Sequence, residues 1–121
     1  MAEQPPRLGI SDQGGVSVVE LAENKILDEK TISGISQQLY ALVADKDAPR
    51  IVLDFVHVGH MSSSALGMLI TLHKRVREKD GRMRLCNIRP SIYEVFVITR
   101  LNEVFKICAD QASAVREAAS A

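Results

Sequence analysis

The sequence has few cysteines, few aromatic residues and no excess of charge of either sign. Its only cysteines are Cys86 and Cys108, too few for a disulfide framework, and they favour a reducing compartment. Its 15 basic residues balance 15 acidic ones, so no overall positive field draws the chain to nucleic acid or to a membrane surface. No stretch approaches the roughly 18 uninterrupted apolar residues of a membrane span, and the N-terminus lacks the basic and apolar pattern of a signal peptide. We therefore expect a cytoplasmic protein.

The length of 121 residues, 46% of them hydrophobic, is sufficient for one compact domain. Two consecutive prolines indicate a flexible leader over residues 1–6, and we expect a single folded domain over residues 7–121. Two short extended runs between residues 8 and 21 flank a Gly-Gly pair, which predicts a β-hairpin. The apolar residues that follow have helical spacing as far as about Lys46, and either Asp28 or Thr31 can cap the start of this helix.

The segment 51–56 is apolar without polar alternation, which is typical of a strand buried on both faces of a sheet. We expect a loop over residues 57–61 and then a second helix that opens with three serines. The side chains expected to be buried on this helix are Leu66, Leu69, Ile70 and Val76, with Ala65, Met68 and Leu72 around them. A third helix is expected to begin at Pro90. Its expected inner face carries Ile92, Val95, Phe96 and Thr99.

Short strands are also expected over residues 83–86 and 105–107, and a last helix over residues 110–119. Strands that alternate with helices imply right-handed crossovers and a largely parallel sheet. The predicted fold class is therefore α/β, with a mixed, mostly parallel sheet, a leading antiparallel hairpin and about four helices.

The sequence contains none of the glycine-rich phosphate loops or nucleophile motifs that mark common enzyme classes. His57 and His60 lie near one another and near Asp54, but a metal site requires a third ligand in a preformed geometry. We interpret both as ordinary loop histidines and Cys86 as a small buried side chain. We therefore expect no catalytic residue, no metal and no cofactor.

Basic residues gather in the second half of the second predicted helix and in the segment after it. They are Lys74, Arg75, Arg77, Lys79, Arg82, Arg84 and Arg89. The simpler interpretation is a solvated helix face whose cations favour the helix C-terminus. The alternative is an electropositive patch for a partner. No aromatic residues are interleaved with the cluster, which argues against binding of single-stranded nucleic acid.

The three serines at Ser62, Ser63 and Ser64 are the most informative feature. One serine is enough to cap a helix, because its hydroxyl oxygen accepts a hydrogen bond from an amide of the first turn. The other hydroxyls are then available for modification. A phosphate there would meet free amides and the positive end of the helix dipole, while adding about −1.5 to −2 charges to the surface. Such a modification would change the surface charge without unfolding the helix, which is what a phosphorylation switch that controls partner binding requires.

The segment from Asp54 to Gly67 resembles the signature of the STAS family, the bacterial anti-sigma-factor antagonists, which runs D-(F/L)-x-x-V-x-x-(M/I)-D-S-(S/T)-G-L-G. The positions that match are Asp54, Phe55, Val58, Met61, Ser63, Ser64, Leu66 and Gly67. Further resemblances are Ile26-Leu-Asp28 before the first helix, Asp80-Gly-Arg82 with Leu85, Asn87 to Pro90, and the closing segment from Leu101 to Ile107. The resemblance implies a STAS domain over residues 7–121.

In that family, the partner is an anti-sigma factor that is also an ATP-dependent serine kinase, and it phosphorylates the first serine of the motif. The resemblance therefore implies phosphorylation at Ser63. It implies a partner-binding surface that comprises Asp28, Met61, Ser62, Ser63, Ser64 and Ala65. Unphosphorylated antagonist binds the kinase and so frees a sigma factor, whereas the phosphorylated form does not bind. A cognate phosphatase and a homodimer are left open, while nucleic acid and membrane are not expected partners.

Three positions depart from the family pattern, because Ser62 replaces its acid, Ala65 replaces a glycine and Arg100 replaces another glycine. Arg100 must either adopt a left-handed conformation, at about 1 kcal/mol, or shift the end of the helix. The leading hypothesis is a regulatory switch without catalytic activity. One alternative is a non-switching STAS scaffold subunit of a stress-sensing or transport-associated assembly, which would fit the altered motif. The other is a small-molecule-binding module or enzyme.

Overall fold

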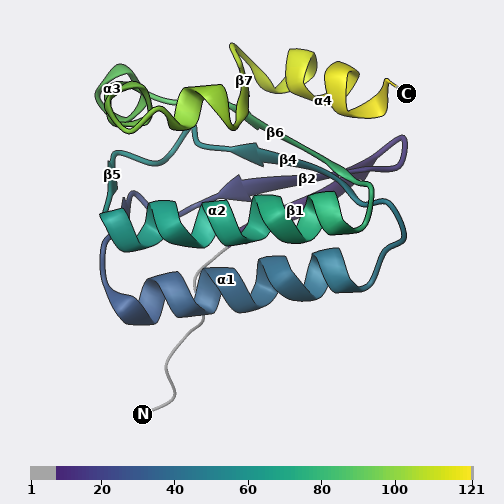
Figure 1. Cartoon of the computed structure of the whole chain (residues 1–121), viewed down its shortest axis with the longest axis horizontal. Coiled ribbons are helices and arrows are strands. Elements are labelled where there is room, and N and C mark those ends of the chain that lie inside the picture. Colours follow the sequence, from purple (N-terminus) through teal and green to yellow (C-terminus); the bar gives the residue numbers. More distant parts are fainter. Residues whose placement is uncertain (1–7, 121) are drawn as a thin grey trace.

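The computed structural model describes residues 8–120, so the leader predicted over residues 1–6 lies outside the described part. The main sheet has five strands in the order β1-β2-β4-β6-β7 (Figure 1). They are β1 (Leu8–Gln13), β2 (Val16–Leu21), β4 (Arg50–Asp54), β6 (Arg82–Cys86) and β7 (Lys106–Cys108). The β1–β2 pair is antiparallel and the other neighbouring pairs are parallel, which confirms the predicted α/β class with its leading hairpin. Gly14 and Gly15 supply the positive φ angles of the hairpin turn, 61° and 88°.

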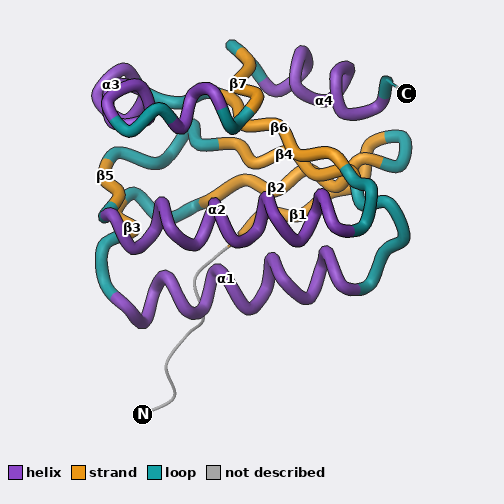
Figure 2. Tube along the Cα trace, in the orientation of Figure 1, coloured by secondary structure: helices purple, strands orange, loops and turns teal. Residues whose placement is uncertain are grey.

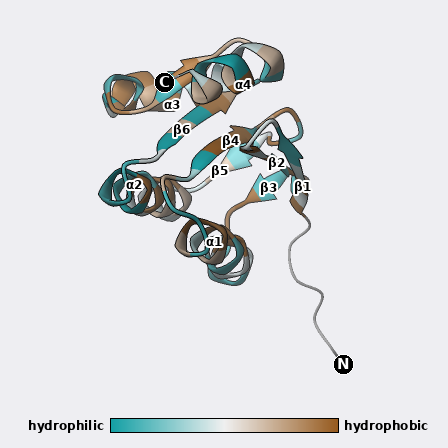
Figure 3. Cartoon of the chain, turned by 90° about the vertical axis from the view of Figure 1, so that its right-hand side faces the viewer, coloured by the Kyte–Doolittle hydropathy of each residue, from teal (hydrophilic) through white to brown (hydrophobic). Residues whose placement is uncertain are grey.

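Four α-helices and one short 3-10 helix connect and cover the strands of the described chain. They are α1 (Glu29–Ala44), α2 (Ser63–Glu78), α3 (Pro90–Ile98), η1 (Leu101–Glu103) and α4 (Gln111–Ala119). The helices α1 and α2 pack side by side on one face of the sheet, and α4 covers the other face (Figure 3). The helix α3 lies toward the β7 edge, where Phe96 stacks edge-on against Phe105 with ring centroids 5.8 Å apart.

The central strand β4 is buried on both faces, as its unbroken apolar sequence predicts. Ile51 and Leu53 are fully buried in the large cluster beneath α1 and α2. Val52 points the other way, into a smaller cluster of valine, cysteine and alanine side chains beneath α4. Cys86 belongs to this second cluster, where burial is the main cause that raises the pKa of its thiol to about 12. Cys86 is therefore a buried thiol at neutral pH, in agreement with its interpretation as a core side chain.

Several boundaries and faces differ from the sequence prediction. The strand expected to reach residue 56 ends at Asp54, because the Asp54 carboxylate accepts a hydrogen bond from the Val56 amide and turns the chain. The prediction that Ile70 and Val95 are buried is wrong, since they are 43% and 41% exposed. Ile70 lies outside the buried face of α2. Helix α3 contacts the core along one narrow side, so Ile92 and Phe96 are its only buried residues. Thr99 is also exposed.

The predicted loop over residues 57–61 contains a short strand, β5 (His60–Met61), that was not predicted from the sequence. It pairs in parallel with β3 (Lys25–Ile26), which was not predicted either, and together they form a separate two-stranded sheet (Figure 2). Two-residue strands carry no periodicity, so no sequence pattern marks them. The last strand is shifted by one residue, to Lys106–Cys108, because the Phe105 amide still donates to Leu101.

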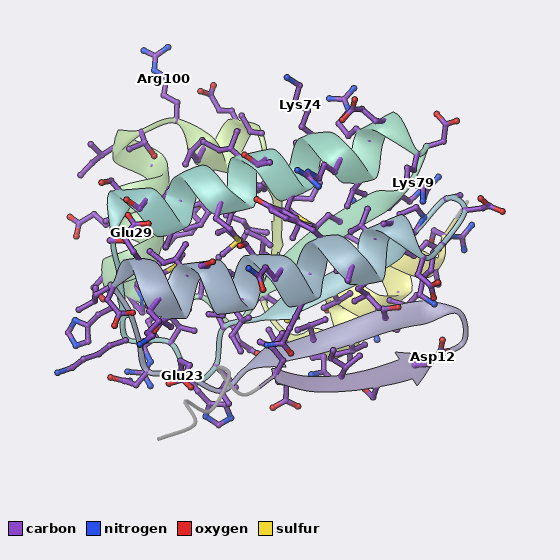
Figure 4. All side chains as sticks on the ribbon, turned by 90° about the horizontal axis from the view of Figure 1, so that it is seen from below. Asp12, Glu23, Glu29, Lys74, Lys79 and Arg100 are labelled. Atoms are coloured by element: carbon purple, nitrogen blue, oxygen red, sulfur yellow. The ribbon has the colours of Figure 1, made fainter. Side chains whose placement is uncertain are left out.

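The basic cluster is not simply a solvated helix face. Lys79, which follows the last residue of α2, donates hydrogen bonds to the carbonyl oxygens of Val43 and Ala44, at 3.0 and 2.9 Å, and so caps the end of α1. The guanidinium of Arg75 lies 4.1 Å from the ring centroid of Tyr40. These cations therefore join α2 to α1, and Figure 4 shows Lys79 at the end of α2 while Lys74 points outward.

Arg100 adopts the left-handed conformation, with φ 62° and ψ 18°, which is the first of the two alternatives derived from the sequence. The turn that it forms lets α3 end at Ile98 and η1 begin at Leu101 without a glycine. The cost is about 1 kcal/mol.

Candidate functional site

The start of α2 separates three adjacent hydroxyl groups into different environments. Ser62 is the N-cap, with extended backbone, and its Oγ accepts a hydrogen bond of 3.2 Å from the Ala65 amide. Ser63 is the first helical residue and is exposed. Ser64 is also exposed and lines the groove between α1 and α2. One hydroxyl therefore holds the helix end and the other two face outward.

The start of α1 is built in the same way around Asp28. Its Oδ1 accepts a hydrogen bond of 2.9 Å from the Thr31 amide, which makes Asp28 and not Thr31 the N-cap. Hydrogen bonding to Thr31 also lowers the pKa of the Asp28 carboxyl below its usual 3.8. An exposed, ionised carboxylate thus marks the first turn of α1, and Glu29 adds a second acid beside it.

The small β3–β5 sheet brings these two helix starts to the same end of the molecule (Figure 1). Ile26 and Met61 are register partners, and the Ser62 amide donates to the Ile26 carbonyl oxygen at 3.1 Å. Asp28 follows Ile26 by two residues, and Ser63 follows Met61 by two residues. Asp28 and Ser63 therefore each lie two residues after a paired residue of this small sheet.

Asn24 fixes the loop that leads into this end, and it was not among the residues predicted from the sequence. Its carbonyl oxygen accepts from the amides of Gly59 and His60, at 2.8 and 3.0 Å, and its side-chain amide donates to the His57 carbonyl oxygen at 3.1 Å. Asn24 lies outside the segments that carry the family signature, and nothing in its sequence context indicates this role.

Asp54 has a structural role at the carboxyl end of β4. It is 3% exposed and accepts hydrogen bonds from the Val56 amide and from the side-chain amides of Asn87 and Gln111, at 2.9, 3.0 and 2.8 Å. Its acceptors are therefore used to join β4 to the chain after β6 and to the start of α4. The imidazole of His57 lies 3.6 Å from a Glu20 carboxylate oxygen. Within residues 8–120, no three His, Cys, Asp or Glu side chains are grouped as metal ligands.

An apolar pocket of about 350 Å³ opens beside the Ser63 end of α2. Its apolar lining includes Leu27, Met61 and Val95, and Leu27 and Val95 are 49% and 41% exposed. Leu27 precedes Asp28, and Met61 lies two residues before Ser63, so this pocket adjoins both helix starts. Ala65, by contrast, is fully buried beneath the first turn of α2 and is not available for direct contact. The surface around Ser63 therefore combines exposed hydroxyls, two carboxylates and an apolar pocket.

Comparison with known proteins identifies relatives of this chain. The STAS domain family model matches residues 10–114. The anti-sigma F factor antagonist of Paenibacillus polymyxa is 25% identical over 103 residues, which are 85% of this chain and 86% of that protein. An anti-sigma-factor antagonist domain protein from Planctomyces limnophilus superposes with a TM-score of 0.82 at 21% identity, over 93% of this chain and 98% of that one. The Bacillus cell fate determinant SpoIIAA, solved in its phosphorylated form, has a TM-score of 0.69 at 17% identity, over 91% and 98%.

Proposed function

The chain belongs to the STAS domain family, and we propose that it is a partner-switching regulator that binds an anti-sigma factor through the surface around Ser63. The relative in Paenibacillus polymyxa is named an anti-sigma F factor antagonist, which supports a partner of this class. We expect the protein to act by occupying that partner and so freeing a sigma factor, without catalytic turnover. The cytoplasm, where sigma factors act, is the compartment that this role requires.

We further propose that Ser63 is the phosphorylated residue. The observation that carries this proposal is the separation of roles at the start of α2, where Ser62 makes the cap and Ser63 is left exposed. The first amides of a helix have no partner within the helix, and the dipole favours negative charge there. A phosphate on Ser63 would be accommodated by that end of α2 without melting it. The solved SpoIIAA is a protein of this fold that carries a phosphate.

The composition of the surface indicates what the partner contributes. Asp28 and Glu29 require basic groups opposite them, and the pocket formed by Leu27, Met61 and Val95 requires an apolar side chain. A phosphate would add about −1.5 to −2 charges beside the two acids. Like charges at a closed interface are costly, because neither is fully solvated. Phosphorylation is therefore expected to lower the affinity for the partner and so release it.

Ser62 replaces the acid of the family motif, yet the substitution preserves the geometry. Serine and aspartate are both favoured N-caps, and each accepts a hydrogen bond from an amide of the first turn. The hydroxyl of Ser62 makes this contact with Ala65. What the chain lacks relative to the motif is one negative charge and not the cap. We therefore expect Ser62→Asp to alter the rate at which a kinase acts on Ser63 rather than the fold.

The experiment is phosphorylation by the cognate anti-sigma kinase with ATP, with the modified residue located by mass spectrometry. We expect phosphate on Ser63 and a Ser63→Ala variant that binds the kinase but is not phosphorylated. Ser64→Ala is the matched control, because it removes a hydroxyl one residue away that also faces outward, and it should still be phosphorylated. Phosphate on Ser64 or elsewhere would assign the modification to another residue.

A second candidate function is supported by the missing acid at Ser62. If a kinase requires that charge, the chain is a constitutive STAS subunit of a larger assembly. In that case neither the natural protein nor its Ser63→Ala variant is phosphorylated, and both bind the same partner equally. The two functions are therefore separated by the same experiment.

A further inference from the structure

A second pocket lies at the opposite end of α2 from Ser63, where the sheet is incomplete. The strand β7 pairs with β6 only from Arg84 to Cys86, so the first two residues of β6 have no neighbour on that side. The resulting hollow, of about 230 Å³, is bounded by α2, by the start of β6 and by the segment from Val104 to Lys106. We call it the β6-edge pocket. Its lining includes His73, Arg77 and Lys106.

The β6-edge pocket concentrates positive charge in a protein that has no net charge. Four of the 15 lysine and arginine residues line it, and none of its lining residues is acidic. Two of these cations are used elsewhere, since Arg84 pairs with Glu117 at 3.2 Å and Arg82 donates to the Ser120 carbonyl oxygen. Arg77 and Lys106 are both exposed, and neither forms an ion pair with an acidic residue of the part of the chain described here. Two uncompensated cations therefore flank one hollow.

His73 lines this pocket and carries a hydrogen-bonding nitrogen that has no partner in the described part of the chain. Its ring packs edge-on against Phe105, with centroids 5.3 Å apart. Within residues 8–120, its Nδ1 is the only buried side-chain nitrogen or oxygen without a hydrogen-bond partner. Burial, and secondarily the nearby charge of Arg77, lowers the pKa of His73, so the ring is neutral at physiological pH. Because Nδ1 is buried, His73 contributes to the pocket as a neutral ring in its wall, and the charged groups of the lining come from the lysine and arginine residues.

We propose that the β6-edge pocket binds a small oxyanion of the phosphate class, held between Arg77 and Lys106 with His73 on the pocket wall. The volume is below the range of about 300–1,000 Å³ that is typical for drug-sized ligands, so it suits a phosphate group rather than a whole nucleotide. Paired cations with N–H donors are the groups that recognise such anions. This site is independent of Ser63, because ten residues of α2, or about 15 Å of helix, separate Ser63 from His73.

The test is a titration of the ¹⁵N-labelled protein with inorganic phosphate at constant ionic strength, followed by amide and imidazole NMR shifts. We expect saturable shifts at His73, Arg77 and Lys106, with no change at Ser63. A parallel titration with glycerol phosphate distinguishes free phosphate from the phosphate of a metabolite, because the source that the pocket prefers should bind more tightly. A Ser63→Ala variant should bind phosphate like the wild type, which separates this proposal from the proposed switch.

The variant Arg77→Gln/Lys106→Gln should weaken phosphate binding by about tenfold or more, because it removes both charge-assisted contacts. Both residues are exposed, so the fold should survive, and the NMR spectrum itself reports whether it does. Lys74→Gln is the matched control. It removes one positive charge next to His73 in the chain, from a side chain that points away from the core (Figure 4), and it should leave the affinity unchanged. Shifts that do not saturate, or an affinity that is the same in the double variant, would overturn the proposal.

Discussion

Ser62 and Ser63 are neighbouring serines in different environments. The Ser62 hydroxyl is committed to the helix cap, and the Ser63 hydroxyl beside it is exposed. The sequence predicted that one serine would cap α2 and leave others available. It could not assign the cap to Ser62 alone, because each of the three serines is a favoured N-cap residue and the sequence does not fix where the helix begins. The exposure of Ser63 follows from the β5 strand, which fixes where α2 begins.

At the carboxyl end of β4, we expect substitution of Asp54 to reduce the stability of the fold. Its buried carboxylate serves three donors, so Asp54→Ala would leave the side-chain amides of Asn87 and Gln111 and the Val56 amide without that partner. We expect a loss of about 1–3 kcal/mol in the free energy of unfolding, measured by urea denaturation. Asp12→Ala is the control, because the Asp12 carboxylate accepts from Gly15 at an exposed turn (Figure 4) and should cost about 0.5 kcal/mol or less. Equal losses in the two variants would contradict the role assigned to Asp54.

At the scale of the elements, two helices depend on ionised caps. Hydrogen bonding to Thr31 and Ser113 lowers the pKa values of Asp28 and Asp110 below their usual 3.8 in the folded protein. As the pH falls, the carboxylates of Asp28 and Asp110 are therefore protonated at a higher pH in the unfolded chain than in the folded protein. The caps stabilise the fold above the unfolded pKa, and their contribution is lost as the pH falls through the lower folded pKa.

We expect Asp28→Asn/Asp110→Asn to lose less stability than the wild type between about pH 5 and pH 2, because asparagine caps a helix without titrating. The measurement is the midpoint of urea unfolding at a series of pH values. The difference in unfolding midpoint between the wild type and the double variant should become smaller as the pH falls. Parallel curves over the whole range would show that neither cap contributes through its charge.

The connection from α2 to β6 depends on close backbone packing at Gly81. A methyl group at this position would overlap the carbonyl oxygen and ring of Pro49, which cannot move aside as a flexible side chain would. We expect Gly81→Ala to cost about 1–3 kcal/mol in the free energy of unfolding. Gly67→Ala is the matched control, since a methyl there meets nothing and the residue lies within α2. Gly67→Ala should stabilise the protein by about 0.5–1 kcal/mol, and a loss of stability there would contradict the difference in packing between the two glycines.

Much of the secondary structure could be predicted from the sequence, but the small β3–β5 sheet could not. Helices were expected from about Asp28, Ser62 and Asp110, and the structure has a helix after each of them. The role of Asp110 as the N-cap of the last helix was not predicted. Strands of two residues have no such local signal, since their pairing depends on the tertiary fold. For the same reason the partners of Lys79 could not be foreseen, because the end of α1 is 35 residues away in the chain.

For the whole molecule, stability depends on the central strand β4, whose side chains are buried in the clusters on both faces of the sheet. Leu53 is fully buried in the larger core, between the sheet and the helices α1 and α2. We expect Leu53→Ala to cost about 2–5 kcal/mol in the free energy of unfolding, because it removes buried methyl groups and leaves a cavity. Ile10→Ala is the control, since Ile10 is half exposed on the edge strand β1. A denaturation midpoint that is unchanged by Leu53→Ala would show that β4 is not the core of the fold.

The proposed switch requires that negative charge at Ser63 controls binding of an anti-sigma factor without disturbing the fold. The most direct test is the affinity of that partner for wild type and for Ser63→Asp, with thermal unfolding of each. Ser11→Asp, which places the same charge on the exposed strand β1, is the control. We predict that Ser63→Asp weakens binding by about tenfold or more and changes stability by less than about 1 kcal/mol, while Ser11→Asp binds like the wild type. Equal affinity of Ser63→Asp and wild type for the anti-sigma factor would contradict the switch.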